Sequence, residues 1–322
     1  RAAVRSIRVG GAPTDVAAIP GGDRVVSFGR SASRVVVADV SRPEGVPASV
    51  EVLGGCNTVS VAPDGGHAIL WYSNARAEAG DPIGPVSEVG VLDLTVDPPV
   101  SHVASVGVNV RLVRFSSDGA AAVVVTDDGA SRIVLAEVHD DVAVPPVPLD
   151  DVTDRPPLGT DRDVLLTPDT SFALVHNPAA AAVGVVDLGS GVRRQRDAGE
   201  AVTDLELVDG GRQFAVLAPG RSGLGIADVD ADGSGDPYRW VELPEASAGF
   251  AIASPSGASV LVSGGVDGTN ILADVNVETG DVTPFLLRKF IRAVGFSSDE
   301  RFVLLVHGRR AGTPVAGEPE ED

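Results

Sequence analysis

The sequence predicts an all-β protein in which one four-stranded unit is repeated seven times. Three observations lead to this prediction. Apolar residues make up 43% of the 322 residues but aromatic residues only 4%, so the core must be filled mainly by Val, Ala, Leu and Ile, a composition that favours pleated sheets. The 38 glycines and 23 prolines are spread along the chain as turn residues. Seven segments share one hairpin pattern, and no segment shows a helical period.

Each of the seven segments consists of a short apolar run, a tight turn rich in Pro, Ser, Asp and Gly, and a second apolar run. This is the pattern of a β-hairpin. The segments begin at Val16, Val59, Val113, Val164, Leu205, Ala251 and Val294. Their turns follow one another at intervals of 43, 54, 51, 40, 47 and 43 residues. Most hairpins are followed by a third apolar run that ends in an acidic residue, and then by a fourth, more polar run.

Four strands in every 40 to 54 residues is the spacing of the blades of a β-propeller. A linear stack of seven such units would need capping ends, whereas a closed ring protects its sheet edges. We therefore expect a seven-bladed β-propeller of four-stranded antiparallel blades over residues 1–308. Residues 309–322 are expected to form an acidic tail rich in Pro and Gly, or an incomplete loop of the last blade.

The opening segment reads IRVGGAPTDVAAIPGGDRVVSFGRSASRVVVADVSRP. It resembles the YVTN-type β-propeller repeat, both in its Gly-Gly-x-Pro lead and in its Pro-Gly-Gly turn, and the likeness extends along almost the whole chain. The resemblance implies the propeller fold and a binding role. It does not imply a particular partner, because members of this family bind different things.

The two ends of the sequence predict how the ring closes. The segment from Arg5 to Val9 precedes the first inner strand, so we expect it to be the outermost strand of the last blade. The seventh copy has two strands and no third apolar run after them. Either that blade is one strand short, or its loop continues beyond residue 322. Because the sequence contains no Met, we expect it to be a processed or excised piece.

The net charge of −20 makes nucleic acid and anionic membranes poor partners. The short basic cluster from Arg193 to Arg196 is interpreted as a solvated strand end. No apolar run reaches the ~18–20 residues of a membrane span. The single cysteine, Cys56, excludes a disulfide within the chain and is expected to be a small packing residue. The near absence of lysine is typical of a high-GC, bacterial genome.

One short segment, DVDADGSGD, concentrates aspartates at alternate or near-alternate positions around a glycine. Calcium takes about six to eight oxygen ligands at about 2.3–2.6 Å, often from one short loop. A curling loop would turn these carboxylates inward, and the carbonyl of the serine would add a further oxygen. We therefore predict one Ca²⁺ bound by Asp228, Asp230, Asp232, Ser234 and Asp236. An ordinary acidic turn is the alternative.

The pattern D-x-D-x-D-G-x-x-D resembles the calcium loops of FG-GAP repeats in integrin-α-type propellers, and also the first nine positions of an EF-hand. A complete EF-hand is excluded, because its closing glutamate would fall at Arg239 and no helices flank the loop. The FG-GAP likeness is partial, since there the loop joins different strands of the blade. The first aspartate also has an explanation without calcium, because an acid ends the third strand in other copies, at Asp39, Asp93, Asp187 and Asp274.

The strands of a blade run alternately up and down, so its loops lie on two faces. The two longest loops run from Asn74 to Ser87 and from Asp140 to Asp163, and they belong to the face opposite the Pro-Asp-Gly turns. Long loops on a rigid ring are the usual place for binding, and disordered insertions are the alternative. We expect a protein or small ligand on this face, cationic or weakly polar because the protein is acidic.

Catalytic patterns are scarce. The five histidines show no HxH or HExxH spacing, and there is no GxSxG elbow. His176 and His307 each end a second strand at the loop-rich face. Arg114, Glu206 and Arg292 are expected to line a polar central channel. We expect a non-catalytic binding scaffold located outside the cytoplasm. The alternatives are a hydrolase or lactonase with an active site in the channel, and a structural subunit of a larger extracellular assembly.

Overall fold

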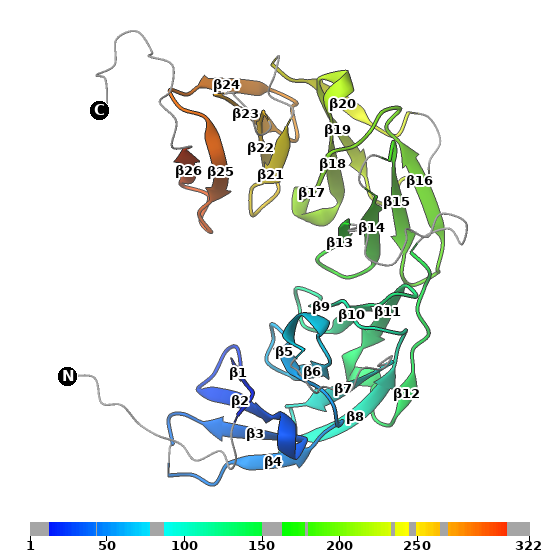
Figure 1. Cartoon of the computed structure of the whole chain (residues 1–322), viewed down its shortest axis with the longest axis vertical. Coiled ribbons are helices and arrows are strands. Elements are labelled where there is room, and N and C mark those ends of the chain that lie inside the picture. The colour runs from blue at the N-terminus through cyan, green and yellow to red at the C-terminus, as the bar shows by residue number, and fades with distance from the viewer. Residues whose placement is uncertain are drawn as a thin grey trace, which may run out of the picture. The chain divides into compact units, whose positions relative to one another are not determined.

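The computed structural model describes residues 13–42, 44–77, 87–149, 163–177, 180–232, 236–244, 249–264 and 270–307. These residues form seven β-sheets, and in each of them the strands that follow one another along the chain pair in antiparallel fashion (Figure 1). The only helices among them are five 3₁₀ turns: η1 (Arg30–Ala32), η2 (Asn74–Arg76), η3 (Leu135–Glu137), η4 (Asp209–Gly211) and η5 (Pro219–Arg221). None of these turns is long or apolar enough to cross a membrane. The expected all-β class is confirmed.

The chain divides into two compact units, which we describe separately. The first covers residues 1–154 together with the turns at 168–171 and 187–191. Its first sheet contains β1 (Asp15–Ala18), β2 (Arg24–Gly29), β3 (Arg34–Asp39) and β4 (Ala48–Glu51). Its second contains β5 (Thr58–Val61), β6 (His67–Trp71), β7 (Glu88–Asp93), β8 (Val100–Ser105) and β12 (Val142–Ala143). Its third contains β9 (Leu112–Phe115), β10 (Ala121–Val125) and β11 (Ala130–Val134).

The second unit contains the remaining strands. They are β13 (Asp163–Leu166), β14 (Phe172–His176), β15 (Ala182–Asp187) and β16 (Arg193–Asp197), then β17 (Asp204–Val208), β18 (Gln213–Ala218), β19 (Gly223–Asp228) and β20 (Arg239–Glu242). These are followed by β21 (Phe250–Ala253), β22 (Ser259–Ser263), β23 (Ile271–Asn276) and β24 (Val282–Leu286), and finally by β25 (Ile291–Phe296) and β26 (Val303–His307). The first twelve strands form three four-stranded sheets, and the last two form a pair.

Four of the sheets contain the expected four strands, and among the described residues the other three contain five, three and two. The sheet β9–β11 has three strands, because the chain after η3 turns away and β12 pairs in parallel with β8 of the preceding sheet. Only an isolated bridge between Val147 and Ala130 stands where a fourth strand was expected. The sheet β25–β26 has two strands among the described residues. The segment 5–9 and the tail 309–322 lie outside them.

The core lies between successive sheets of each unit. One apolar cluster joins β1–β4 to β5–β8, and another joins β5–β8 to β9–β11. In the second unit, one cluster joins β13–β16 to β17–β20 and another joins β17–β20 to β21–β24. Val, Ala, Leu and Ile fill these layers, as the composition predicted. Cys56 is part of the first cluster, and its burial raises the pKa of the thiol to about 12.

The turns between first and second strands also contact one another. In the second unit, the Asp209 amide donates to the Gly257 carbonyl at 2.9 Å. Gly257 has φ +72°, and a Cβ at this position would lie 2.5 Å from the Asp209 nitrogen. Both facts require glycine there. The next turn has Glu300 at the equivalent position, with φ 57°, and its carboxylate accepts bonds from the amide and the hydroxyl of Ser256.

Candidate functional sites

The acidic segment predicted to bind calcium forms the connection between β19 and β20. The carboxylate of Asp228 accepts a hydrogen bond from the Gln213 side chain at 2.7 Å, and that of Asp236 accepts one from the Tyr238 amide at 3.1 Å. Asp230 and Asp232 are exposed. Residues 233–235, which include Ser234, lie outside the described residues. Across the described part of the chain, no group of three or more His, Cys, Asp or Glu is arranged to hold a metal. Calcium binding therefore stays a prediction.

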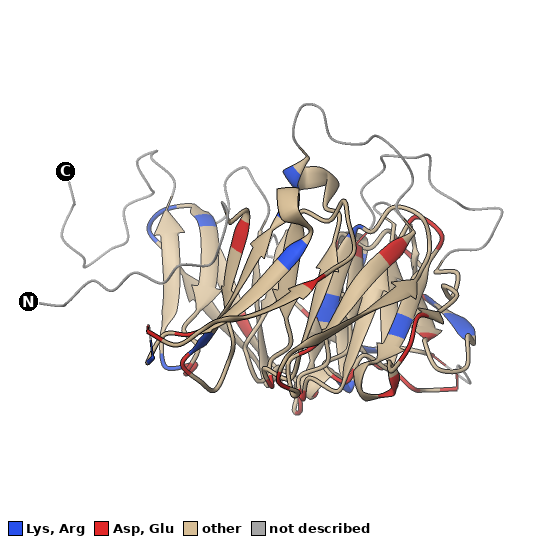
Figure 2. Ribbon diagram, turned by 90° about the horizontal axis from the view of Figure 1, so that it is seen from below, with Lys and Arg blue, Asp and Glu red and all other residues tan. Residues whose placement is uncertain are grey.

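Asp228 differs from the acids at the equivalent position of other sheets. Asp39 accepts bonds from both the amide and the hydroxyl of Ser41, and Asp93 accepts the same pair from Thr95. Asp187 likewise accepts from the amides of the turn that follows it. Figure 2 shows acidic residues in turns and at strand ends of the described sheets. Asp228 instead accepts its bond from the Gln213 side chain of the neighbouring strand, and its hydrogen bonds to the described residues include none from its own turn.

The residue that corresponds to Asp228 in the sheet β21–β24 is Asn276, and the sequence-based choice of Asp274 was wrong. Asn276 pairs with Ser259 as Asp228 pairs with Gln213, at the start of the second strand. Its side-chain oxygen accepts bonds from the amides of Glu278 and Thr279. Asn can close this turn as Asp does. The third strand of this sheet therefore ends in Asn, where the corresponding strands end in Asp.

A buried arginine lies beneath the acidic turn. Arg196 on β16 is only 1% exposed, and its Nη2 donates to the Ala231 carbonyl inside the turn. Its Nε has no hydrogen-bond partner among the described residues. The interpretation of this arginine as part of a solvated strand end was therefore wrong. A guanidinium withdrawn from water needs negative charge or carbonyl oxygens nearby, and the acidic turn supplies the carbonyl oxygen of Ala231.

Aromatic side chains hold the two ends of this arrangement together. The Tyr238 hydroxyl donates to the Arg196 carbonyl at 3.1 Å, and the ring packs edge-on against Phe214 at 5.9 Å. Trp240 lies 5.4 Å from Tyr238, and the guanidinium of Arg221 covers its ring at 4.8 Å. The segment after the turn is thus fixed by Tyr238 and Trp240.

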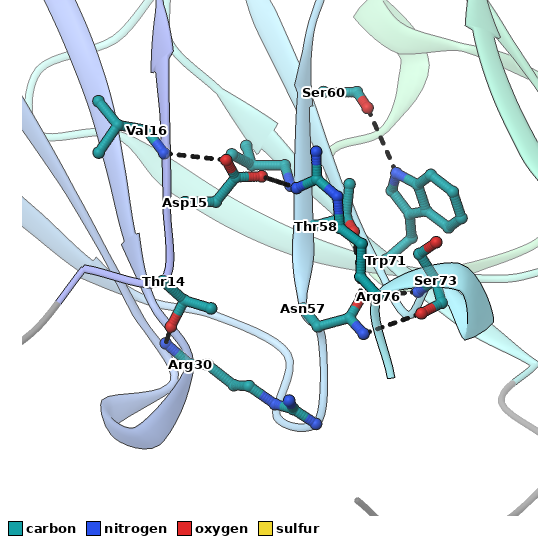
Figure 3. A network of polar contacts seen from close by, with 11 residues as sticks. Thr14, Asp15, Val16, Arg30, Asn57, Thr58, Ser60, Trp71, Ser73 and Arg76 are labelled. Atoms are coloured by element: carbon teal, nitrogen blue, oxygen red, sulfur yellow. Dashed lines mark hydrogen bonds and ion pairs between the residues drawn. The ribbon is translucent and has the colours of Figure 1, made fainter. Parts of the chain in front are cut away.

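In the first unit, the first strand of one sheet is tied to the next sheet by Asp15 (Figure 3). Its Oδ2 accepts from Arg76 Nη1 at 2.6 Å and from the Val59 amide at 3.4 Å, and its Oδ1 accepts from the Val16 amide at 3.0 Å. Val59 belongs to β5, the first strand of the next sheet. Arg76 belongs to η2, at the start of the predicted binding loop 74–87. One carboxylate therefore fixes both a sheet and the root of a loop.

Asn57 fixes the same loop from the other side (Figure 3). Its amide nitrogen donates to the Ser73 carbonyl at 2.9 Å, and its side-chain oxygen accepts from the Ser73 amide at 2.7 Å. The Thr58 hydroxyl donates a second bond to the same oxygen at 3.0 Å. Asn57, Thr58 and Ser73 are all buried, so these bonds are made away from solvent, where an unmade bond would be costly.

In the second unit, Asp204 on β17 holds the position that Asp15 holds on β1. Its Oδ2 accepts from the Ala251 amide of β21 at 2.7 Å. Two residues further along the same strand lies Glu206, which accepts a bond from the Ala253 amide. Burial and the nearby charge of Asp204 raise the pKa of Glu206 to about 7, against the lowering effect of that amide. Such a carboxyl group exchanges its proton near neutral pH.

The two histidines singled out in the sequence have different surroundings. His176 ends β14 and is 1% exposed. Its Nε2 lies 2.9 Å from the Val202 carbonyl oxygen and therefore carries a proton, while its Nδ1 lies 3.7 Å from Asp163. His307 ends β26, is exposed, and places Nδ1 3.2 Å from the Lys289 carbonyl. Each imidazole ring contacts a backbone carbonyl, and the described contacts do not bring the two histidines into one site.

The second predicted binding loop, 140–163, is described only up to residue 149. That part is attached to two sheets. Asp141 accepts from the Val103 amide at 2.9 Å, and the Val144 carbonyl accepts from the Ser131 hydroxyl at 2.8 Å. Together with β12 and the Val147 bridge, these bonds fix the first third of the loop onto the first unit. The alternation of Val and Pro in this stretch was the available signal, but it did not identify the pairing strand.

Of the three residues expected in a channel, Arg114 and Arg292 are exposed and Glu206 is half-buried. Glu206 was the informative member, because its burial and the charge of Asp204 raise its pKa to about 7. The feature that sequence reasoning missed is Arg196. In the sequence, Arg196 appears only as an arginine two residues before a connection that contains glycine. This pattern is too common to identify a buried arginine.

No family model matches the chain, and no curated protein sequence matches it. Similar folds occur among solved structures at low identity. One is a functionally unknown protein from Desulfotomaculum acetoxidans DSM 771, with 11% identity, a TM-score of 0.41, and coverage of 81% of this chain and 78% of that chain. Another is Kuenenia stuttgartiensis hydrazine synthase, with 15% identity, a TM-score of 0.41, and coverage of 95% and 97%. A third is a eukaryotic initiation factor, with 12% identity, a TM-score of 0.48, and coverage of 96% and 85%. At TM-scores below 0.5, none of them bears on the function of this chain.

Proposed function

We propose that this chain is a β-propeller that serves as a non-catalytic binding scaffold outside the cytoplasm. The proposal is supported by seven hairpin repeats, by sheets whose strands follow one another along the chain, and by apolar layers between successive sheets. A scaffold needs rigid sheets and loops with fixed roots. Both are features of the first unit.

The observation that carries the proposal is the attachment of the two longest loops. Arg76 and Asn57 fix the first loop where it leaves its sheet. β12 and Val147 fix the second along its first ten residues. Loops that were only insertions would not need such bonds. With a net charge of −20, the partner should be cationic or weakly polar, and its association should weaken with salt.

Photo-crosslinking tests this assignment. A benzophenone amino acid is placed at Ala79 in the first loop, at Thr153 in the second, and at Val46 as a control. Val46 is 97% exposed and lies in the connection between β3 and β4. Incubation with extract of the source organism should give the same salt-sensitive adduct from Ala79 and Thr153 and none from Val46. Adducts from Val46 alone would move the binding surface to the other loops.

The second candidate function is a hydrolase or lactonase, and Glu206 is the observation that favours it. A carboxyl group with a pKa of about 7 suits general acid–base catalysis. A panel of lactones and esters is incubated with the wild type and with Glu206→Gln. Hydrolysis that is lost in a folded Glu206→Gln variant would establish the enzyme. The scaffold proposal expects no hydrolysis by either protein.

We also propose that the acidic turn binds one structural Ca²⁺. Asp228 accepts a bond from the Gln213 side chain, and Asp230, Asp232 and Asp236 are exposed. Terbium bound there should luminesce through Trp240 and be displaced by calcium. The double substitution Asp230→Asn, Asp232→Asn should abolish the signal. Calcium at a hundredfold excess over Kd should stabilise the fold by roughly 2.7 kcal/mol. Absence of both effects in the wild type would leave only an acidic turn.

Ring closure belongs to the same proposal. We propose that the segment 5–9 completes the last blade as its outermost strand. The support is the two-stranded state of β25–β26 beside three four-stranded sheets in the same unit. Deletion of residues 1–10 should lower the melting temperature sharply, because a sheet edge would be exposed. An unchanged melting temperature would refute the closure.

A further inference from the structure

The indole ring of Trp240 in the second unit lies against two glycines and is covered by a guanidinium. Trp240 is half-buried on β20, where it pairs with Gly225 of β19. A Cβ at Gly225 would lie 3.0 Å from the ring, and one at Gly223 would lie 3.2 Å from it. The guanidinium of Arg221, an exposed residue, stands 4.8 Å from the ring centre. The glycines therefore leave room for the ring, and an arginine occupies the space over it.

The sheet β1–β4 shows that the fold does not need this stacked pair. By the pairing registers of the two sheets, Ser49 of β4 stands where Trp240 stands in β20. In the 3₁₀ turn before the third strand, Ala32 of η1 corresponds to Arg221 of η5. Both turns nevertheless end at a serine with positive φ, and both sheets have four strands. The turn and the fourth strand thus form without an arginine on a tryptophan.

A carboxylate without a described counter-ion lies on the same strand as the ring. Glu242 is exposed and follows Trp240 by two residues, so both side chains project from the same face of β20. In the sheet β1–β4 its counterpart Glu51 has Arg34 as a partner at 3.9 Å. Gly223 takes the place of that arginine in β19. Among the described residues, Glu242 therefore forms no ion pair.

A second carboxylate comes from the connection between β16 and β17, which interlocks with η5. A Cβ at Gly220 would collide with the Glu200 carboxylate, and one at Gly199 would lie 3.0 Å from Arg221 Nη2. Glu200 thus lies beside the residue that precedes the stacked arginine. Neither Glu200 nor Arg221 forms an ion pair with a described residue. The guanidinium stays on the ring although a carboxylate is near.

We propose that the ring of Trp240, together with Glu200 and Glu242, is a binding site for an arginine side chain of the partner protein. In the free chain Arg221 occupies this site. The inference rests on the proposed scaffold function for the existence of a partner with cationic groups. The site lies at η5, which joins a second to a third strand, as the predicted binding loop 74–87 does.

The contact of Arg221 itself shows which chemistry the ring accepts. A guanidinium is planar and weakly hydrated, so it stacks on an indole better than an ammonium group does. The quadrupole of the ring attracts the positive charge, and the two carboxylates add to that attraction. Because Arg221 is exposed and stacks without an ion pair to a described residue, an arginine of the partner can replace it over the ring.

A small probe tests the site in the full chain. Nα-acetyl-arginine amide is titrated into protein labelled with 5-fluorotryptophan, and fluorine NMR follows the two tryptophans of the chain. The Trp71→Phe variant assigns their signals. We expect a saturable shift of the Trp240 signal and none of the Trp71 signal. Nα-acetyl-citrulline amide has the same shape without the charge, and it should give no saturable shift over the same concentrations.

Three variants sharpen the test. Arg221→Ala removes the internal occupant and should tighten binding of the arginine probe about threefold. Glu200→Gln and Glu242→Gln should each weaken it roughly twofold. The matched control is Arg212→Ala, at an exposed arginine of the same sheet that pairs with Asp209, and it should leave the affinity unchanged. Circular dichroism checks that each variant is folded.

Three results would overturn the proposal. They are an unmoved Trp240 signal in folded Arg221→Ala protein, an equal shift with the citrulline probe, and equal tightening by Arg212→Ala. The probe needs no partner, so this test is separate from the photo-crosslinking at Ala79 and Thr153. Crosslinking without binding of the arginine probe would refute the site and keep the scaffold. Binding of the probe without crosslinking would support the site and refute the scaffold assignment.

Discussion

The sheets β1–β4 and β17–β20 have the same arrangement of strands and turns. Comparing them shows which contacts are common to both sheets and which differ. Residues 14–40 align with residues 203–229 without a gap. In both, a 3₁₀ turn follows the second strand and ends at a serine with positive φ, Ser33 at 45° and Ser222 at 49°. In both, the leading aspartate accepts a bond from the amide of the next sheet's first strand.

The charges around that shared bond are different. Asp15 has Arg76 as an ion-pair partner and Ala17 two residues later, whereas Asp204 has Glu206 at that position. No ion pair to Asp204 occurs among the described residues. The backbone-directed bond is thus the constant part of the design. The neighbouring charges differ. Asp15 has a basic partner in Arg76, whereas Asp204 lies near Glu206, a carboxyl group with a pKa of about 7.

The connection after the third strand differs as well, and breaking it should have the largest effect. In the sheet β1–β4, Asp39 closes this connection. In the sheet β17–β20, it rests on Arg196. Arg196→Met should lower the free energy of unfolding by about 3 kcal/mol, because the Ala231 carbonyl loses its charged donor. Urea denaturation measures this. Arg194→Met on the same strand is the control, and an equal loss there would contradict the role of Arg196.

Removal of the shared aspartate should have the next largest effect, and an unequal one. Asp15→Ala should cost about 2 kcal/mol, because Arg76 and the Val59 amide both lose a partner. Asp204→Ala should cost about 1 kcal/mol, because the lost bond to Ala251 is partly offset by relief of repulsion with Glu206. Equal losses in denaturant titrations at pH 8 would show that the neighbouring charges do not matter.

The third test uses pH. The pKa of Glu206 in the folded protein, about 7, lies above its ordinary value of 4.5, so the folded state binds this proton more tightly than the unfolded state. The resulting stabilisation is fully present below pH 4.5 and is lost as the pH rises through 7. Glu206→Gln mimics the protonated form. It should be more stable than the wild type by about 1 kcal/mol at pH 8, allowing for solvent screening, and equal to it at pH 4.

The smallest effect is expected from giving the first unit the carboxylate that Glu206 provides in the second. Ala17→Glu places a carboxylate where Glu206 stands, but close to an aspartate that already has Arg76 as a partner. We expect a loss below about 0.5 kcal/mol at pH 8. Adding Arg76→Ala should enlarge that loss, as measured by thermal melts of the single and double variants. A large loss in the Ala17→Glu variant alone would mean that packing, rather than charge, governs this position.

The hairpins were predictable because their causes are local. A turn such as the one at Gly65 needs a residue with positive φ next to short apolar runs, and both appear in the sequence within a few residues. The same requirement is met at Thr170 and Glu300 by residues that rarely adopt this conformation, with φ of 58° and 57°. There the flanking Ser and Asp, rather than glycine, indicated the turn.

The candidate sites were less predictable, because their causes lie in contacts between sheets. The burial of Arg196 depends on a carbonyl 35 residues away in the next sheet. The pairing of β12 with β8 depends on bonds to Asp141 that no local pattern displays. The acidic segment was visible at once as a cluster of aspartates. The hydrogen bond from the buried Arg196 to the Ala231 carbonyl of this segment was not visible, because it joins two different sheets.

The strand β12 also sets the order in which the first unit can assemble. Every other described pairing joins strands adjacent in the chain, so each of those sheets can form as soon as its own residues leave the ribosome. The sheet β5–β8 is different, because its outer edge is completed only by residues 142–143, after β9–β11 have been synthesised. During translation, β8 therefore stays an open edge for about 40 residues of synthesis, or several seconds at usual rates.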